Sequence, residues 1–168
     1  MIGLDTERLW KVTVIVENAN HTEEEYNLDL SYSEDRSRLE EIIDEREDGQ
    51  YITCYVGRLE TEVDVDLLSE IANTFFYNFD TEQEGAFYAY LEDYGDCEIE
   101  KAYEISVNGE YSFVGDDVFK DFDNASYYFA ELNDIPEHLR FYFDLEMFID
   151  DMLNDYVYVD GYGYYFLN

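Results

Sequence analysis

The residues that could do chemistry in this 168-residue chain are mostly carboxylates. The sequence contains 43 Asp and Glu, 9 Lys and Arg and 2 His, which gives a formal net charge of −34 at pH 7. Adjacent acids such as Asp116-Asp117 and Asp150-Asp151 have the residue types of a general acid and base pair. Such pairs are expected by chance at this density of acids, so they do not indicate catalysis.

The other patterns typical of enzymes are not found. His21 and His138 lie far apart, and no serine has the His and Asp companions of a hydrolase triad. The glycines fit no phosphate-binding or dinucleotide-binding loop. We therefore predict that the protein is not an enzyme and needs no cofactor.

Asp44, Asp48 and Gly49 resemble the start of an EF-hand calcium loop. Arg46 stands at a ligand position, and Tyr55 stands where the loop needs a bidentate Glu. The sequence thus predicts no metal site.

The composition indicates a folded chain with an unusual surface. Hydrophobic residues make up 46% and aromatic residues 18%, with 18 Tyr and 12 Phe, which excludes simple disorder. The acidic balance excludes direct nucleic-acid binding through a basic face and disfavours an anionic membrane surface. No apolar run is long enough for a membrane span, and the N-terminus lacks the features of a signal peptide, so we expect a cytoplasmic protein. Cys54 and Cys97 are expected to be small buried side chains rather than a disulfide.

The charge is concentrated in the second part of the chain. Residues 59–100 contain 13 carboxylates and no Lys or Arg, whereas an ordinary solvated helix face would carry compensating Lys. Adaptation to high salt, cation binding and imitation of a polyanion could each explain this excess. B-DNA carries one charge per 1.7 Å of axis, so the net charge corresponds to about 17 base pairs. We favour the polyanion mimic.

The elements that must position these charges are mixed. Alternating apolar residues predict strands at 10–16, 27–31 and 51–56, with residues 21–25 as a connection, and a helix over 34–47 capped by Ser33. This order favours a small antiparallel sheet carrying one helix.

The rest of the chain is predicted to be helical and then mixed. Helices are expected over 65–79 and 80–94, the second with an Asp80–Gln83 capping box and an inward Tyr94, and near 96–102. Asn108-Gly109 predicts a hairpin turn, Pro136 begins a further helix that breaks near Asp144, and residues 156–166 form a closing hairpin.

Residues 133–153 resemble the C-terminal segment of the ArdA antirestriction proteins. The matching positions are Pro136, Glu137, Leu139, Tyr142, Asp144, Glu146, Asp150 and Leu153. Leu145 replaces the Tyr usual in that family, and Asp151 stands where a basic or neutral residue is common. Leu68-Ser69-Glu70-Ile71-Ala72 and the order of the elements also resemble the family, whereas residues 1–58 match only in layout.

The resemblance implies an elongated α+β protein of three small domains. These would be an N-terminal ββαβ domain (1–58), an acidic helical domain (59–103) and a mixed C-terminal domain (104–168) that forms a homodimer. The family mimics bent B-DNA and occupies the DNA cleft of type I restriction-modification enzymes on behalf of a mobile genetic element. The dimer could use the aromatic edges at Tyr111, Phe113 and residues 156–166, or these could be buried inside one domain.

The partner-binding carboxylates expected to stand in for phosphates lie after residue 58. They are Glu60, Glu62, Asp64, Asp66, Glu70, Glu82, Glu84, Glu92, Asp93, Asp116, Asp117, Asp121, Asp123, Glu137, Asp144, Glu146, Asp150 and Asp151. Two other functions stay open: inhibition of another nucleic-acid enzyme, such as a CRISPR effector, and a halophilic or cation-binding globular protein.

Overall fold

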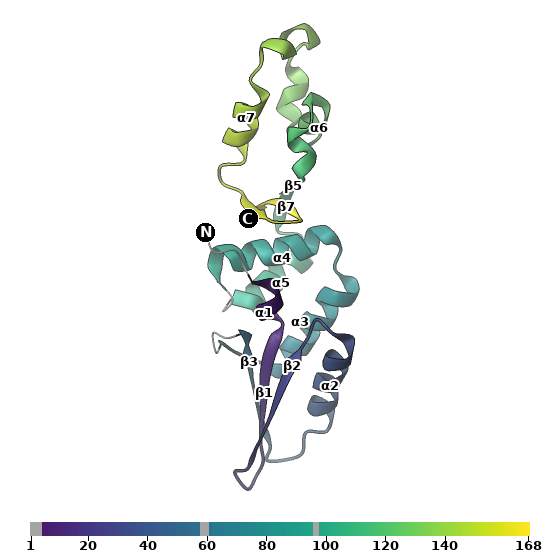
Figure 1. The fold of residues 1–168 in the computed structure, drawn as a ribbon, viewed down its shortest axis with the longest axis vertical. Helices are drawn as coiled ribbons and strands as arrows, with labels where there is room; N and C mark the ends of the chain where they lie inside the picture. Colours follow the sequence, from purple (N-terminus) through teal and green to yellow (C-terminus); the bar gives the residue numbers. More distant parts are fainter. Residues whose placement is uncertain (1–4, 58–60, 96–97) are drawn as a thin grey trace.

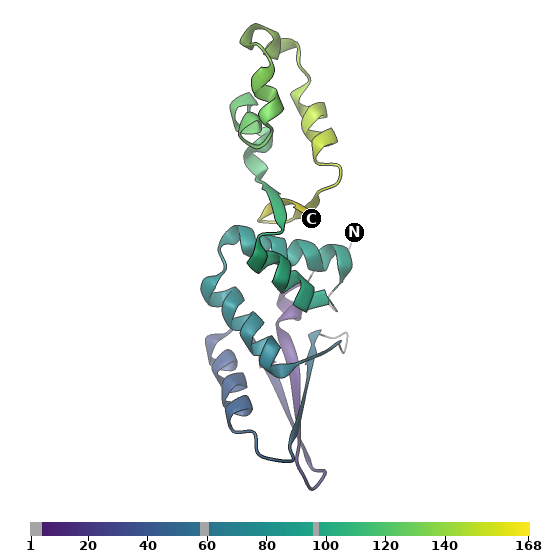
Figure 2. The same cartoon turned by 180° about the vertical axis from the view of Figure 1, so that it is seen from behind.

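The computed structural model describes residues 5–57, 61–95 and 98–168. The molecule is elongated, with a sheet at one end, helices in the middle and a second lobe at the other end (Figure 1). The view from behind shows the same three levels along the long axis (Figure 2). The α+β class and the elongated form expected from the sequence are confirmed. Within the described ranges, no helix is long and apolar enough to cross a membrane.

The N-terminal sheet has the order β2-β1-β3-β4, with every pair antiparallel. Val12, Val14 and Val16 on β1 are buried, as their alternation predicts. The predicted strand, strand, helix, strand order is confirmed, and the short β4 is an addition. The elements are α1 (Thr6–Leu9), β1 (Lys11–Glu17), β2 (Glu23–Asp29), α2 (Ser33–Asp44), β3 (Tyr51–Val56) and β4 (Thr61–Val63).

Three predicted boundaries in this region were wrong. β2 already begins at Glu23, inside the predicted connection, because residues 23–25 pair in register with residues 15–17 of β1. Backbone pairing with β1 extends the hairpin there although the acidic side chains face solvent. The N-cap of α2 is Tyr32 rather than Ser33, and the helix ends at Asp44 instead of 47.

The middle of the chain consists of α3 (Val65–Asn78), α4 (Thr81–Tyr94) and α5 (Ile99–Asn108). The Asp80–Gln83 capping box is present, as predicted. Phe87 and Leu91 on α4 belong to the core shared with the N-terminal sheet. Tyr94, predicted to face inward, is 56% exposed, because at the end of α4 it stacks on Tyr90 at 4.5 Å instead of entering the core.

The hairpin predicted at Asn108-Gly109 is wrong. α5 continues to Asn108, and Gly109 ends it in the left-handed conformation with φ 67°. A helix C-terminus and a tight hairpin both need a residue with positive φ, so the two residues alone did not distinguish them. Ile105 and Ser106 are buried on α5, and this tertiary burial favours the helix.

The C-terminal lobe has a sheet of order β5-β7-β6. The closing hairpin is confirmed, as is the helix that starts after the cap Asp144. The helix expected after Pro136 is only a 3-10 segment, η5, none of whose residues is buried, so no core contact stabilises a longer helix. The elements are β5 (Tyr111–Val114), η3 (Asp116–Phe119), α6 (Phe122–Tyr128), η4 (Ala130–Asp134), η5 (Glu137–Tyr142), α7 (Leu145–Met152), β6 (Val157–Val159) and β7 (Gly163–Leu167).

Three hydrophobic clusters form among the described residues. The largest draws on residues 9–102, so side chains from both sides of position 58 share one core. It includes Cys54, which is buried with a free thiol; Cys97 lies outside the described residues. A second cluster, around Val118, Leu132 and Ile149, fills the C-terminal lobe. The predicted domain boundaries stay predictions.

The third cluster joins the lobe to α4. Ala86 and Ala89 of α4 pack against the fully buried Tyr165 of β7. Tyr111 and Phe113, which the sequence offered as a dimer edge or as interior residues, are half-buried against Tyr165 with ring centroids at 5.9 and 5.2 Å. This packing favours a position in the interior of one molecule over a dimer edge.

Candidate functional site: the acidic surface

The carboxylates lie on the outside of the molecule. Within the described ranges, the buried polar or charged residues are Arg36, Ser69 and Ser106, and none of them is acidic. The described acids are exposed except for a half-buried minority, which consists of Glu17, Asp29, Asp35, Glu84 and Glu92. The scaffold therefore displays its negative charge almost entirely to solvent.

Several of the expected phosphate mimics are helix N-caps. Asp64 accepts from the Leu67 amide at 2.9 Å and Asp144 from the Met147 amide at 3.0 Å. Asp121 accepts from the Asn124 amide at 2.8 Å, and this backbone hydrogen bond lowers the pKa of Asp121. Each carboxylate satisfies an amide at a helix start and complements the helix dipole.

A second group is held by tyrosine hydroxyls. Glu70 on α3 accepts from Tyr103 of α5 at 3.0 Å. Glu84 on α4 accepts from Tyr162 at 3.1 Å, and Asp117 on η3 accepts from Tyr128 of α6 at 2.8 Å. A neutral hydroxyl fixes the position of a carboxylate without cancelling its charge, which a Lys or Arg partner would do.

The pKa values of these three tyrosines are raised, so their hydroxyls stay protonated and can donate. Burial, and then the hydrogen bond and charge of Asp117, raise the pKa of Tyr128 to about 12. Burial and the charge of Glu84 likewise raise the pKa of Tyr162. The hydroxyls therefore keep donating well above neutral pH, so the acidic groups stay in place there.

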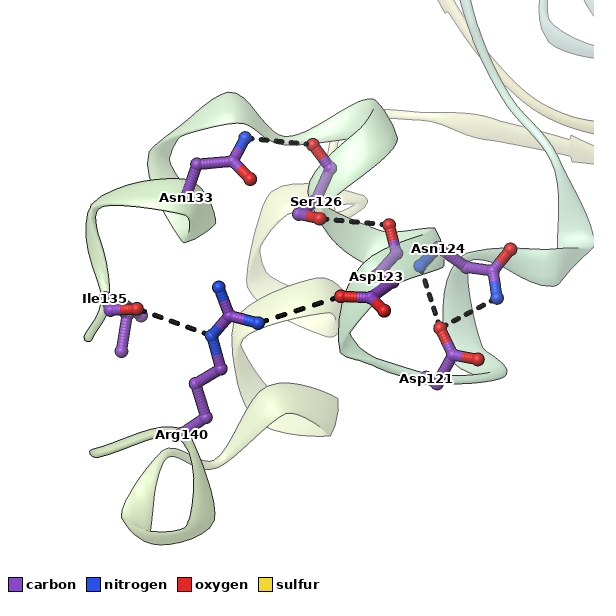
Figure 3. A network of polar contacts seen from close by, with 7 residues as sticks. All are labelled: Asp121, Asp123, Asn124, Ser126, Asn133, Ile135 and Arg140. Atoms are coloured by element: carbon purple, nitrogen blue, oxygen red, sulfur yellow. Dashed lines mark hydrogen bonds and ion pairs between the residues drawn. The ribbon is translucent and has the colours of Figure 1, made fainter. Parts of the chain in front are cut away.

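Among the described residues, cations approach two of the expected mimics. Arg46 approaches Asp66 at 3.6 Å, from outside the 59–100 window that lacks basic residues. Arg140 approaches Asp123 at 3.7 Å (Figure 3). Both pairs are solvent-exposed enough that each contributes little, typically 0–1 kcal/mol.

Arg140 has a positioning role within residues 133–153. Its guanidinium donates to the Ile135 carbonyl at 3.4 Å and lies beside Asp123 of α6 (Figure 3). It also lies 4.3 Å from the centroid of the Phe122 ring, so it ties η5 to α6. Leu153 at the end of this segment is buried, whereas Tyr142 is exposed. The segment thus combines packing residues with a solvent-facing portion.

The other expected mimics fall into three groups. Glu60 lies outside the described residues, and Glu92 is half-buried on α4. The remaining carboxylates are exposed and form no ion pair with any described cation; they are Glu62, Glu82, Asp93, Asp116, Glu137, Glu146, Asp150 and Asp151. These are the groups best placed to meet a cationic partner.

Two further features of the described residues bear on what the surface could bind. No group of three or more His, Cys, Asp or Glu within them is placed to hold a metal ion. A hollow of about 530 Å³ beside β1 and β2 has a mixed lining that includes Arg8, Lys11, Asp29 and Asp35.

Comparison with known proteins adds no relative. No family model, no curated protein and no solved structure matches the chain.

Proposed function

We propose that this chain is a DNA-mimic antirestriction protein that occupies the DNA-binding cleft of type I restriction-modification enzymes. The observation that carries the proposal is an elongated scaffold whose described carboxylates all reach solvent, some of them fixed by tyrosine hydroxyls. The resemblance of residues 133–153 to ArdA supplies the class of target.

The mechanism is competition for a basic channel. Lys and Arg of the enzyme that normally contact DNA phosphates pair instead with the carboxylates of the inhibitor, and the counterions of both surfaces are released. Carboxylates held on helices do not need to be ordered on binding, which lowers the entropic cost of association. The inhibitor blocks access and does no chemistry.

The deciding experiment is competition against DNA for a purified type I methyltransferase core. The wild-type chain should displace DNA, and single neutralisations should change little because the footprint is distributed. Neutralising four exposed carboxylates after residue 58 together should weaken competition by at least about tenfold. That set is Glu62→Gln, Asp93→Asn, Asp116→Asn and Glu146→Gln.

A matched control removes the same charge outside the expected footprint. It combines Glu23→Gln, Glu34→Gln, Glu45→Gln and Glu47→Gln, all exposed in the N-terminal part. Equal losses in the two sets would indicate bulk charge rather than a located surface. No displacement by the wild-type chain would refute the proposed target, and a parallel assay with a CRISPR effector tests the other class of nucleic-acid enzyme.

The proposal includes a homodimer, which the resemblance places in the C-terminal part. Phe141 and Tyr142 at the end of η5 are 89% and 82% exposed and pack edge to face on each other at 5.5 Å. Light scattering on the wild type and on Phe141→Ser tests whether these rings contribute to association. A dimer unaffected by the substitution would place the contact elsewhere.

A further inference from the structure

An aromatic hollow lies where α4, β5 and α6 meet. Its volume is about 350 Å³, and its lining consists of Glu82, Tyr111, Phe113, Tyr127 and Tyr128. No Lys, Arg or His is among these residues. The proposed function uses Glu82 as one charge among many and gives no role to the rings.

The rings of this aromatic hollow face in different directions. Tyr127 and Tyr128 are nearly perpendicular, at 88° with centroids 5.1 Å apart, and Phe113 meets Tyr128 at 82° and 6.5 Å. The hydroxyl of Tyr128 donates to Asp117, which fixes that ring. Tyr127 is 84% exposed, so its ring is accessible to a partner and contributes little to the core.

The electrostatics of the aromatic hollow suit a cation. Glu82 lines it, and the charges of Asp80 and Glu82 reach Tyr111, where they add to the effect of burial in raising the pKa of that tyrosine. Asp117 lies next to Tyr128. The negative face of each ring adds to the same field, so a positively charged group with an apolar stem is favoured.

Arginine is the cation that this chain itself places against both an aromatic ring and a carboxylate. The guanidinium of Arg140 lies 4.3 Å from the Phe122 ring centroid and 3.7 Å from Asp123. Arg38 likewise lies 5.4 Å from the centroid of the Tyr26 ring and pairs with Glu41 at 2.9 Å. A planar guanidinium can stack on a ring and also form a forked pair with a carboxylate, whereas a lysine ammonium cannot do both.

We propose that the aromatic hollow receives an arginine side chain of the partner enzyme, stacked on Tyr127 and paired with Glu82. This inference rests on the proposed function and adds a defined anchor to it. One located, partly desolvated arginine would contribute more than a rim charge pair and would fix the register of the inhibitor in the cleft.

The first test is the competition assay with Tyr127→Leu. The substitution leaves the net charge unchanged, so a purely Coulombic mimic predicts no effect. We expect the affinity for the methyltransferase core to fall about fivefold. The matched control is Tyr51→Leu, which removes a ring that is 72% exposed on β3. If the wild type competes and Tyr127→Leu competes equally well, the anchor is refuted while the proposed function stands.

The second test does not depend on the enzyme. N-acetyl-arginine methylamide is titrated into the isotope-labelled chain, with sodium chloride at equal ionic strength as the reference. We expect saturable NMR shifts at Tyr111, Phe113, Tyr127 and Tyr128, weakened at least about threefold by Glu82→Gln. Shifts spread evenly over the acidic surface, or unchanged by Glu82→Gln, would overturn the inference even if no target enzyme were inhibited. Circular dichroism of each variant checks that the fold is kept.

Discussion

The hydroxyl of Tyr162 donates to Glu84 Oε2 at 3.1 Å, although the two residues are 78 positions apart. Tyr162 lies in the turn between β6 and β7, and Glu84 lies on α4. The bond therefore links the C-terminal lobe to the middle of the molecule and at the same time fixes a carboxylate. It represents a wider pattern in which tyrosines position acids without neutralising them.

Tyr162→Phe should show the value of this positioning. The substitution keeps the ring and the net charge but releases Glu84, so we expect unfolding free energy to fall by about 1 kcal/mol. Competition for the methyltransferase core should weaken only slightly, by up to about twofold, because Glu84 must then be ordered on binding but is one charge of a distributed footprint. Chemical denaturation and the DNA-displacement assay measure the two effects.

Tyr26→Phe is the control for that prediction. Tyr26 donates to Glu24 at 2.8 Å on β2, so the same kind of bond is lost outside the expected footprint. It should reduce stability without weakening competition. If both variants weakened competition equally, the effect of Tyr162 would come from general destabilisation rather than from the placement of Glu84.

Alkaline pH should destabilise the chain through its buried tyrosines. Burial raises the pKa of Tyr88 to about 12 and raises the pKa of Tyr165. Because the folded-state pKa is higher than the unfolded value near 10, this contribution is fully present below about pH 10 and is lost as pH rises toward about 12. Each such tyrosine should lower the unfolding free energy by about 1.4 kcal/mol per pH unit in that range.

Denaturant unfolding at about pH 8 and about pH 11, with tyrosinate absorbance followed in the folded state, measures this effect. A folded chain in which all tyrosines ionise together near pH 10 would contradict the burial of Tyr88 and Tyr165. Stability that stays constant across the range would do so as well.

The sequence predicts local features of this molecule well and distant pairings poorly. The capping box at Asp80 and Gln83 is visible because its two residues are three positions apart. The turn at Asn108-Gly109 was misassigned because positive φ serves both a hairpin and a helix end, and burial of α5 decides between them.

The candidate surface, too, was predictable in its local features and not in its distant pairings. The acidic excess follows from the composition, and the outward faces of α3 and α4 follow from the helical periodicity. The bonds of Tyr103 to Glu70 and of Tyr162 to Glu84 join residues 33 and 78 positions apart, and no window of sequence contains them. The high tyrosine content was the only available signal, and it does not say which tyrosine meets which acid.

Salt should act in opposite directions on stability and on binding. The chain should be folded at ordinary ionic strength and become modestly more stable with added salt, because screening reduces repulsion among its carboxylates. Competition with DNA for the methyltransferase core should also be measured against salt, and the affinity of the inhibitor should fall as salt rises. A chain that folds only in molar salt would support the halophilic alternative and contradict the mimic.

Tyr165→Phe should be neutral or stabilising even though Tyr165 is fully buried. Its hydroxyl is buried and has no hydrogen-bond partner among the described residues. Its ring occupies the space beside Gly85 of α4, where any side chain at that position would collide with it. Removing the oxygen relieves the desolvation of an unsatisfied group while the ring keeps its contacts with Ala86 and Ala89.

Thermal unfolding of Tyr165→Phe should therefore show an unchanged or higher midpoint, whereas Gly85→Ala should destabilise the chain by about 1–3 kcal/mol through overpacking. A marked loss of stability in Tyr165→Phe would mean that the hydroxyl has a partner, such as an ordered water, and that the contact between α4 and β7 depends on it.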